Sequence, residues 1–257
     1  SIGPLVCLGD RVVLGERASI AAGVVIGRNE DMFLPKGETS GGVAWNETLF
    51  WNVYYVKGAF LNADAAFEVL NGLRTLELRM LAKCINTEIL TRFLDAHPSI
   101  RVQSNALGSN ANAPLREAQM FLGLPAPLFT IDFDGVPRDA FQRFFDNLAP
   151  TFGHMISLGQ TNTIVSCPAL TTHSELAPEQ LAEAGISPTT IRFAVGHEDP
   201  FDLIAHLKAT AELALDPSVP GFSGGFLDAE ATTRLVRKCY TEAHRRYIEA
   251  RSAERRP

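Results

Sequence analysis

The sequence predicts an α/β fold that includes a smaller α+β domain at residues 116–216. Short runs rich in β-branched and aromatic residues alternate with segments in which apolar residues recur every three or four positions. The chain has 257 residues, of which 46% are hydrophobic, and this is enough to bury a substantial core. A mean hydropathy of +0.04 fits a globular protein that is soluble.

The first 58 residues are predicted to hold two strands and a long loop. Leu5 to Leu14 and Ile20 to Ile26 are β-branched runs separated by glycine-containing steps, a pattern typical of buried strands. Residues 28–58 mix Gly, Pro and polar residues with aromatic residues such as Trp45. We expect an ordered loop there, of the length that often contacts a partner.

Residues 59–115 are predicted to be a helical connection. Asn62 is a plausible N-cap, and apolar residues recur at helical spacing from there to His97, which precedes a proline. The pattern allows one long helix or two helices joined near Gly72. Residues 99–114 are rich in Ser and Asn and predict a loop.

The remaining elements follow the same rules. Strands are predicted at Leu128 to Phe133, Thr163 to Cys167 and Thr190 to Val195, and helices at Arg138 to Asn147, Pro178 to Ala184 and Pro200 to Leu215. Residues 217–257 are predicted to form a linker and an extra helix capped by Asp228. The apolar stripe of that helix needs cover, for which we expect a partner, and its basic side is interpreted as a solvated face.

Composition argues against several classes of partner and site. A formal charge of −6 and a pI near 5.5 provide no basic surface for nucleic acid. No stretch approaches the roughly 20 apolar residues that a bilayer crossing needs, and the start lacks the pattern of an export signal, so we expect a cytoplasmic protein. The four cysteines lack metal-ligand spacing and are expected to be free thiols.

Two segments resemble the Cys/Met-metabolism family of pyridoxal-phosphate enzymes, which includes cystathionine γ-synthase, cystathionine γ-lyase, methionine γ-lyase and O-acetylhomoserine sulfhydrylase. Residues 157–207 read SLGQTNTIVSCPALTTHSELAPEQLAEAGISPTTIRFAVGHEDPFDLIAHL, similar to the family's carboxy-terminal motif in order and spacing. Residues 62–101 contain GLRTLELRM, similar to its long helical connection. The resemblance implies the carboxy-terminal part of a fold-type I pyridoxal-phosphate transferase, with residues 1–58 as an incomplete remnant of the large domain.

The resemblance also implies a substrate site. The family's arginine, which grips the substrate α-carboxylate, corresponds to Arg192, and the serine of its Ser-Leu-Gly step corresponds to Ser157. Without the resemblance, Arg192 would be interpreted as a strand arginine paired to an acid such as Glu198. For Thr172 and His173 we favour structural roles, as caps of the helix near Pro178 or as partners of buried backbone.

The family's cofactor lysine has no counterpart here. Aligning GERASIAAGVVIG with the strand that follows this lysine places its position at Asp10 or Arg11, and no lysine precedes Lys36. Neither residue can form an imine with the cofactor aldehyde. Nearby, Cys7 and Gly9 occupy the places of the Ser and Thr that help to hold the cofactor phosphate. The family's first strands also precede everything in this chain, so the elements that surround the cofactor are expected from another chain.

Other departures from the family motif are Asn162, Cys167, Leu170 and His197, which put the substrate preference in doubt. Three hypotheses remain open. The chain is a subunit of a heteromeric enzyme of sulfur amino-acid type, catalysing β- or γ-elimination or replacement, whose lysine-bearing homologue holds the pyridoxal phosphate. Alternatively, it is a non-catalytic scaffold or regulatory pseudo-subunit for such a partner, or a binding protein for a small amino acid. No catalytic, cofactor-binding or metal-binding residue is predicted in this chain.

Overall fold

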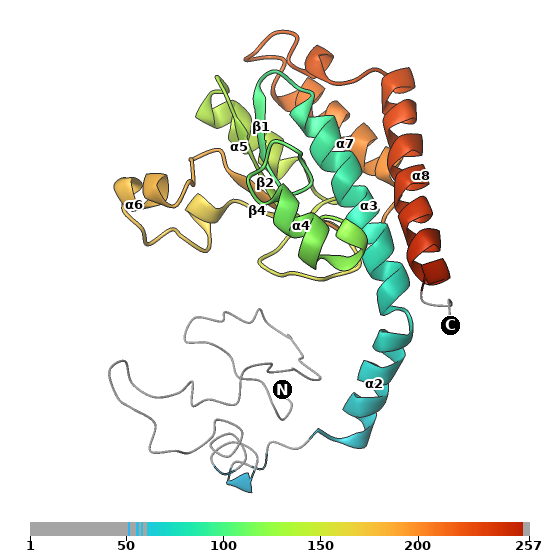
Figure 1. The fold of residues 1–257 in the computed structure, drawn as a ribbon. Coiled ribbons are helices and arrows are strands. Elements are labelled where there is room, and N and C mark those ends of the chain that lie inside the picture. Colours follow the sequence, from blue (N-terminus) through green and yellow to red (C-terminus); the bar gives the residue numbers. More distant parts are fainter. Residues whose placement is uncertain (1–50, 52–54, 57, 59–60, 254–257) are drawn as a thin grey trace. The chain divides into compact units, whose positions relative to one another are not determined.

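The structure is a computed structural model that describes residues 51, 55, 56, 58 and 61–253 (Figure 1). The strands predicted between Leu5 and Ile26, and the lysine position at Asp10 or Arg11, lie outside the described residues. The chain forms two compact units, residues 1–77 and 78–257. The predicted domain boundaries after residues 58, 115 and 216 stay predictions.

Two helices, not one, follow Asn62. The Asn62 side chain accepts a hydrogen bond of 2.8 Å from the Ala65 N–H and begins helix α2, Ala63–Arg74, which confirms the predicted cap. Helix α2 ends at Thr75, and α3 covers Leu76–Asp95. The break therefore falls three residues after Gly72. Most of α3 belongs to the second unit, and most of its side chains from Leu81 onward are buried.

A five-stranded sheet lies at the centre of the second unit, in the order β1-β2-β5-β4-β3. Neighbouring strands are antiparallel except for β3 and β4, which are parallel. The strands are β1 Ile100–Gln103, β2 Leu128–Phe133, β3 Gly153–His154, β4 Ile164–Ser166 and β5 Ile191–Ala194. The three predicted strands correspond to β2, β4 and β5, whereas β1 lies in the predicted loop and β3 was not anticipated.

The two faces of this sheet differ in chemistry because successive side chains of a strand point to opposite sides. Phe129 and Phe193 are directly opposed on β2 and β5, and their rings stack with centroids 4.9 Å apart. Together with Ile131 and Ile191 they are buried in the core. Thr130, Asp132 and Arg192 are at alternate positions of these strands, so the second face is the place to look for a site.

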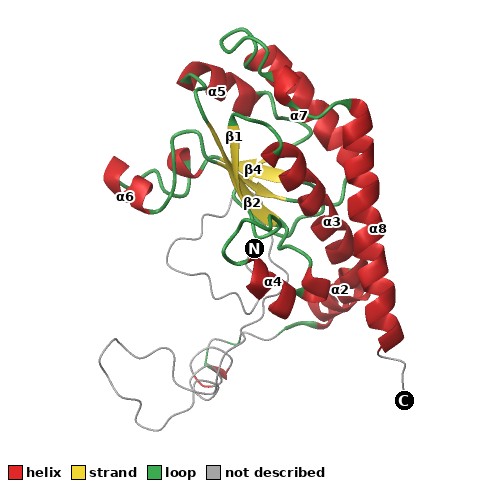
Figure 2. Cartoon of the chain, turned by 45° about the horizontal axis from the view of Figure 1, so that its top comes forward, coloured by secondary structure: helices red, strands yellow, loops and turns green. Residues whose placement is uncertain are grey.

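Helices surround the sheet (Figure 2). Helices α5, Arg138–Asp146, α6, Pro178–Glu183, and α7, Pro200–Ala214, confirm three predictions to within one residue at their ends. Helix α4, Ala113–Gln119, begins inside the predicted loop at residues 99–114. Short 3-10 turns occur at Phe121–Gly123 (η2), Pro168–Leu170 (η3) and Ser223–Gly225 (η4). None of the helices in the described residues is long and apolar enough to cross a membrane.

The stretch between Pro217 and the last helix is packed against the core. Phe222 and Phe226 are buried, and both rings lie against His97, with centroids 4.2 and 4.6 Å away. Gly225 passes so close that a Cβ there would lie 2.5 Å from the His97 Nε2. The segment that the sequence suggested as a linker therefore holds the end of α3 in place.

The last helix, α8, covers Ala229–Ala253 and begins as predicted, with the Asp228 side chain accepting a hydrogen bond of 2.7 Å from the Ala231 N–H. Its apolar stripe, Val236, Cys239 and Ala243, is buried in the core of its own chain. Both views show α8 running beside α3 (Figures 1 and 2). Part of the stripe is thus covered within the chain, whereas Ile248 is 63% exposed, and the expected contact with a partner stays a prediction. The arginines of its other side pair largely with acids on the surface, as expected of a solvated face.

Candidate functional site

Arg192 lies at the middle of the sheet, on β5. Its direct neighbours are Thr130 on β2 and Ser166 on β4. Ile191 and Phe193, on either side of it in sequence, are fully buried on the core face. Strand alternation therefore places the Arg192 side chain on the polar face, in a row with two hydroxyl residues.

The Arg192 guanidinium is partly buried and has no partner in the part of the chain that the structure describes. Its Nε is buried without a hydrogen bond, and no ion pair of Arg192 exists among the described residues. Burial lowers the pKa of Arg192 below its ordinary value, although an arginine remains charged in any such setting. A desolvated cation with unused donors is suited to bind a carboxylate.

Glu198 is not the partner of Arg192 that the alternative interpretation required. Its carboxylate accepts hydrogen bonds from the main-chain N–H of Thr163 and, at 2.9 Å, from the Thr163 hydroxyl. Thr163 in turn accepts a bond of 3.0 Å from the Gly196 N–H. Glu198 thus serves to join the end of β5 to the start of β4.

Ser157 lies in the loop that follows β3 and is half-buried. The start of this loop is fixed by the Met155 N–H, which donates to the Val165 carbonyl at 3.2 Å. No hydrogen bond joins Ser157 to Arg192 among the residues that the structure describes. The structure therefore supports Arg192 by its own geometry, whereas Ser157 rests on the family motif.

Thr172 and His173 do not cap α6. The Thr172 hydroxyl and the His173 Nδ1 lie 2.8 Å apart and bond to each other, and the His173 N–H donates to the Pro168 carbonyl. The first residue before α6 is Ala177, whose N–H donates to the Gln180 side chain at 2.9 Å. The predicted cap was wrong, and the two side chains instead stabilise the turn ahead of the helix.

A buried lysine beside this site was missed by the sequence analysis. Lys83, on α3, is only 2% exposed, and its ammonium donates to the main-chain carbonyl of Gln160. Burial, followed by the charge of Arg79, lowers the pKa of Lys83, and Glu198 opposes this effect. Gln160 is three residues after Ser157, so Lys83 holds the loop that carries Ser157. The available signal was a lysine among apolar residues, Leu81, Cys84 and Ile85.

Asn86, one turn further along α3, extends this network. Its side-chain NH₂ donates to the carbonyls of Gly196, at 3.3 Å, and Glu198, at 2.7 Å. Gly196 leaves no room for a side chain, since a Cβ would lie 2.3 Å from a Glu198 carboxylate oxygen. Helix α3 therefore fixes both loops that leave the sheet near Arg192.

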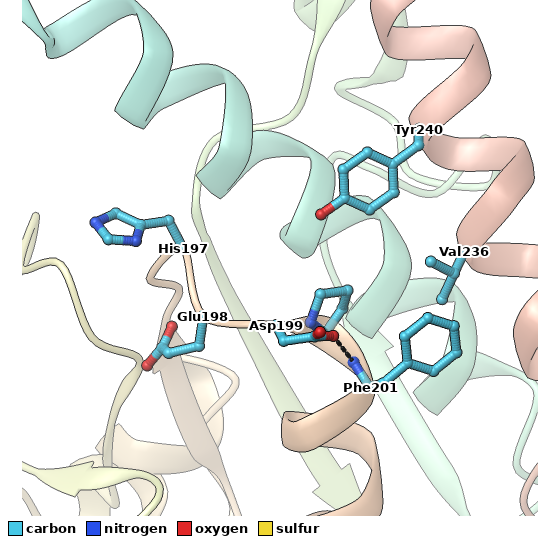
Figure 3. Close-up of a pocket in the computed structure, with 7 residues that line it drawn as sticks. His197, Glu198, Asp199, Phe201, Val236 and Tyr240 are labelled. Carbon is cyan, nitrogen blue, oxygen red and sulfur yellow. Dashed lines mark hydrogen bonds between the residues drawn. The ribbon is translucent and has the colours of Figure 1, made fainter.

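A surface hollow lies at the opposite side of the same loop, between the start of α7 and α8 (Figure 3). Figure 3 shows the Tyr240 ring facing the segment from His197 to Phe201. Asp199 caps α7 by accepting from the Phe201 N–H at 2.8 Å, and burial, aided by Asp199, raises the pKa of Tyr240. Because Asp199 and Glu198 already have structural partners, this hollow has no free catalytic pair.

The positions where the chain departs from the family motif differ in exposure. Cys167, after β4, is buried and its thiol is free, and burial raises its pKa. Asn162, Leu170 and His197 are exposed. Within the described part of the chain, no three His, Cys, Asp or Glu side chains gather to hold a metal ion.

The family relationship is direct. A sequence model of the family "Cys/Met metabolism PLP-dependent enzyme" matches residues 17–212. The chain belongs to this family, and the predicted resemblance is confirmed. The match begins after Asp10 and Arg11, so it does not locate the lysine position.

Curated relatives act on sulfur amino acids or their precursors, by name. An L-methionine gamma-lyase of Porphyromonas gingivalis is 29% identical over 200 residues, which make up 76% of this chain and 45% of that protein. O-acetyl-L-homoserine sulfhydrylase 1 of Thermus thermophilus is 35% identical over 153 residues, or 59% and 36% of the two chains. This chain spans less than half the length of these relatives.

Solved structures share the fold. A cystathione gamma lyase of Micromonospora echinospora superimposes with a TM-score of 0.57 and 31% identity, over 66% of this chain and 44% of that one. Cystathionine gamma synthase of Xanthomonas oryzae pv. oryzae gives a TM-score of 0.57 at 28% identity, over 66% and 43%. The mixed α/β fold of the pyridoxal-phosphate-dependent lyases and synthases, predicted from the sequence, is confirmed.

The described residues fit the carboxylate of a substrate better than they fit the cofactor. An imine with the cofactor aldehyde requires a free lysine amine. Among the described lysines, Lys83 and Lys208 both donate to main-chain carbonyls, of Gln160 and Leu227, and Lys238 is exposed on α8. None of them lies on the strands beside Arg192.

Proposed function

We propose that this chain is a subunit of a heteromeric pyridoxal-phosphate enzyme that acts on sulfur-containing or O-activated amino acids by β- or γ-elimination or replacement. Its part is to bind the substrate α-carboxylate through Arg192. A second chain, a homologue with the lysine, holds the cofactor and supplies the amine that moves protons. This chain alone is then inactive.

The observation that carries the proposal is the unpaired guanidinium of Arg192. A partly buried cation without a counterion is unfavourable, and a folded chain retains one where it meets an external anion. The guanidinium presents two parallel N–H donors to a carboxylate and so fixes its orientation as well as its position. The names of the relatives support an amino acid as the source of that carboxylate.

The second support is the sequence at the lysine position. We infer that this position is Asp10 or Arg11, and the first lysine of the chain is Lys36. Neither a carboxylate nor a guanidinium can condense with an aldehyde under physiological conditions, so the amine must come from elsewhere. A lysine-bearing homologue is the simplest source, because it would bring a matching surface and the cofactor together.

The test is affinity purification of the full chain from its native host. We expect a lysine-bearing homologue to co-purify and to give a yellow complex, whose absorption changes when L-methionine is added. In the same complex, Arg192→Lys should weaken the response to L-methionine, because a single ammonium cannot reproduce the two-donor contact. A colourless chain that purifies alone and is stable without a partner would rule the proposal out.

A scaffold or regulatory role is the second candidate. Met155, Ile156 and Leu158, which surround Ser157, are 48%, 54% and 59% exposed. Exposed apolar side chains that cluster in this way favour a contact surface. The activity of the homologue alone separates the two roles, since a scaffolded enzyme keeps full activity when this chain is removed and a shared site does not. A chain that binds L-methionine while no lysine-bearing homologue co-purifies with it would instead favour an amino-acid-binding protein.

A further inference from the structure

Two buried polar atoms without partners lie on adjacent strands of the sheet. One is the Nε of Arg192, and the other is the hydroxyl oxygen of Ser166, a residue that is 3% exposed. Buried polar groups are nearly always hydrogen-bonded, because leaving one unpaired is unfavourable. Two such atoms at neighbouring positions indicate a shared partner that comes from outside the described residues.

The sheet register brings these two side chains together. Ser166 on β4 and Arg192 on β5 are directly opposed in an antiparallel pair. Directly opposed residues point to the same face, with Cβ atoms about 4.5–5.5 Å apart. At that spacing, the Ser166 hydroxyl and the Arg192 Nε can both reach the two oxygens of one carboxylate.

Acids of the same sheet do not supply the missing partner. Asp132, on β2, is two residues beyond Thr130, the other register neighbour of Arg192. The Asp132 carboxylate already accepts hydrogen bonds from the hydroxyls of Ser187, at 2.5 Å, and Thr190. It is therefore engaged by residues that directly precede β5 and does not neutralise Arg192.

We propose that Ser166 is a second carboxylate-binding residue of this chain, with its hydroxyl donating to one oxygen of the substrate α-carboxylate while Arg192 Nε–H donates to the other. This inference rests on the proposed function, in which Arg192 binds that carboxylate. It adds a donor on β4 that fixes the rotation of the carboxylate about its axis. The hydroxyl prefers a carboxylate to an amide, because a donor to a charged acceptor forms the stronger bond.

The test uses the full chain labelled with nitrogen-15, in which the Arg192 Nε–H signal is assigned from Arg192→Lys. L-Methionine and L-methioninamide, which lacks the carboxylate, are titrated into the wild type and variants. We expect L-methionine, but not the amide, to shift the signal. Ser166→Ala should raise the dissociation constant about tenfold, whereas Ser166→Thr, which keeps the hydroxyl, should stay near the wild-type value.

Controls make each outcome decisive. Ser166→Cys is a second variant without a strong donor, for use if Ser166→Ala does not fold, and Ser174→Ala removes an exposed hydroxyl that bonds to the Thr171 carbonyl. Equal affinity in the wild type and in Ser166→Ala or Ser166→Cys overturns the role of Ser166 alone and leaves a bound water as its partner. Absence of any response in the wild type overturns both this inference and the proposed role of Arg192.

Discussion

Two polar clusters of the second unit, one around Lys83 and Glu198 and one at Arg192 and Ser166, differ in their hydrogen-bond partners. Around Lys83 and Glu198, the charged side chains have hydrogen-bond partners inside the chain. At Arg192 and Ser166, the buried polar atoms have none among the described residues. The first cluster holds loops in place, and the second is where we propose that a carboxylate from outside binds.

The comparison shows that a structural residue is distinguished from a binding residue by two properties together: the burial of its polar atoms and whether those atoms have hydrogen-bond partners. A buried charge alone does not indicate a site, because Lys83 is more deeply buried than Arg192 and yet is engaged by a main-chain carbonyl. The unmatched donors are the informative feature. Asn86 is the intermediate case, since its NH₂ group is bonded twice and its Oδ1 has no partner within the described residues.

The largest effect is expected at the satisfied cluster. Glu198→Ala should lower the free energy of unfolding by about 3 kcal/mol, because it strands the Thr163 N–H and hydroxyl and leaves Lys83 without a nearby negative charge. Urea unfolding of the full chain measures this. Glu212→Ala, which removes an exposed acid from α7, should change stability by less than about 0.5 kcal/mol. Equal effects of the two substitutions would remove the distinction between the clusters.

Lys83→Met comes next, with an expected loss of about 2 kcal/mol, because the Gln160 carbonyl loses its donor while the apolar stem is preserved. Amide hydrogen exchange at residues 156–160 should also become faster. Lys208→Met is the matched control, since Lys208 donates to the Leu227 carbonyl at 3.0 Å from a less buried position. If exchange at residues 156–160 stays unchanged, Lys83 does not position the Ser157 loop.

At Arg192, by contrast, a substitution should not lower the free energy of unfolding. Arg192→Met removes a desolvated cation and an orphan donor, so we expect the free energy of unfolding to stay constant or rise by up to about 1 kcal/mol. The same variant should lose the response to L-methionine. Urea unfolding of the wild type and the variant side by side tests the comparison. A loss of more than about 2 kcal/mol would show that Arg192 is a structural residue.

The smallest effect on stability is expected at His97, a buried side chain whose two ring nitrogens both have hydrogen-bond partners. Its Nε2 lies 2.8 Å from the Phe222 carbonyl, and its Nδ1 accepts from the Ser99 N–H at 3.1 Å, so the ring is neutral. Burial lowers the pKa of His97 below its ordinary value of 6.5. As the pH falls below 6.5, the unfolded chain therefore binds the proton first, and the wild type loses stability.

His97→Gln lacks this titration and serves as the reference for that prediction. The difference in unfolding free energy between the wild type and His97→Gln, measured from pH 7 to pH 5, should shift against the wild type as the pH falls. The difference should level off only well above pH 6.5, where neither the folded nor the unfolded chain binds the proton. A difference that does not change with pH would mean that the His97 ring accepts a proton in the folded chain.

Local sequence patterns predicted the helices and strands well where the spacing of apolar side chains and the cap residues indicated the same element. The strand from Leu128 to Phe133 was predicted with both ends correct, and the predicted helix caps at Asn62 and Asp228 are both present. Strand β1 was missed, since its four residues lie beside a Ser- and Asn-rich stretch and are strand-like only when paired with β2. The two-residue β3 likewise exists through its pairing with β4.

The candidate site was predicted in part. Arg192 was found through the family motif, and its environment was not, because neither the register of β4 and β5 nor the partners of Glu198 can be read from a linear pattern. Ser166 gave no distinct signal, and Lys83 gave only the weak signal of a lysine among apolar residues. A lysine in a helix and a serine in a strand are ordinary until the tertiary structure buries them.

The sequence by itself determined the family and the helices and strands with strong periodicity and caps, because these depend on residues close together in the chain. The tertiary structure decided which polar groups are matched. Hydrogen-bond partners of buried atoms come from strands and loops distant in sequence, so only the packed chain distinguishes Lys83, which is satisfied, from Arg192 and Ser166, which are not.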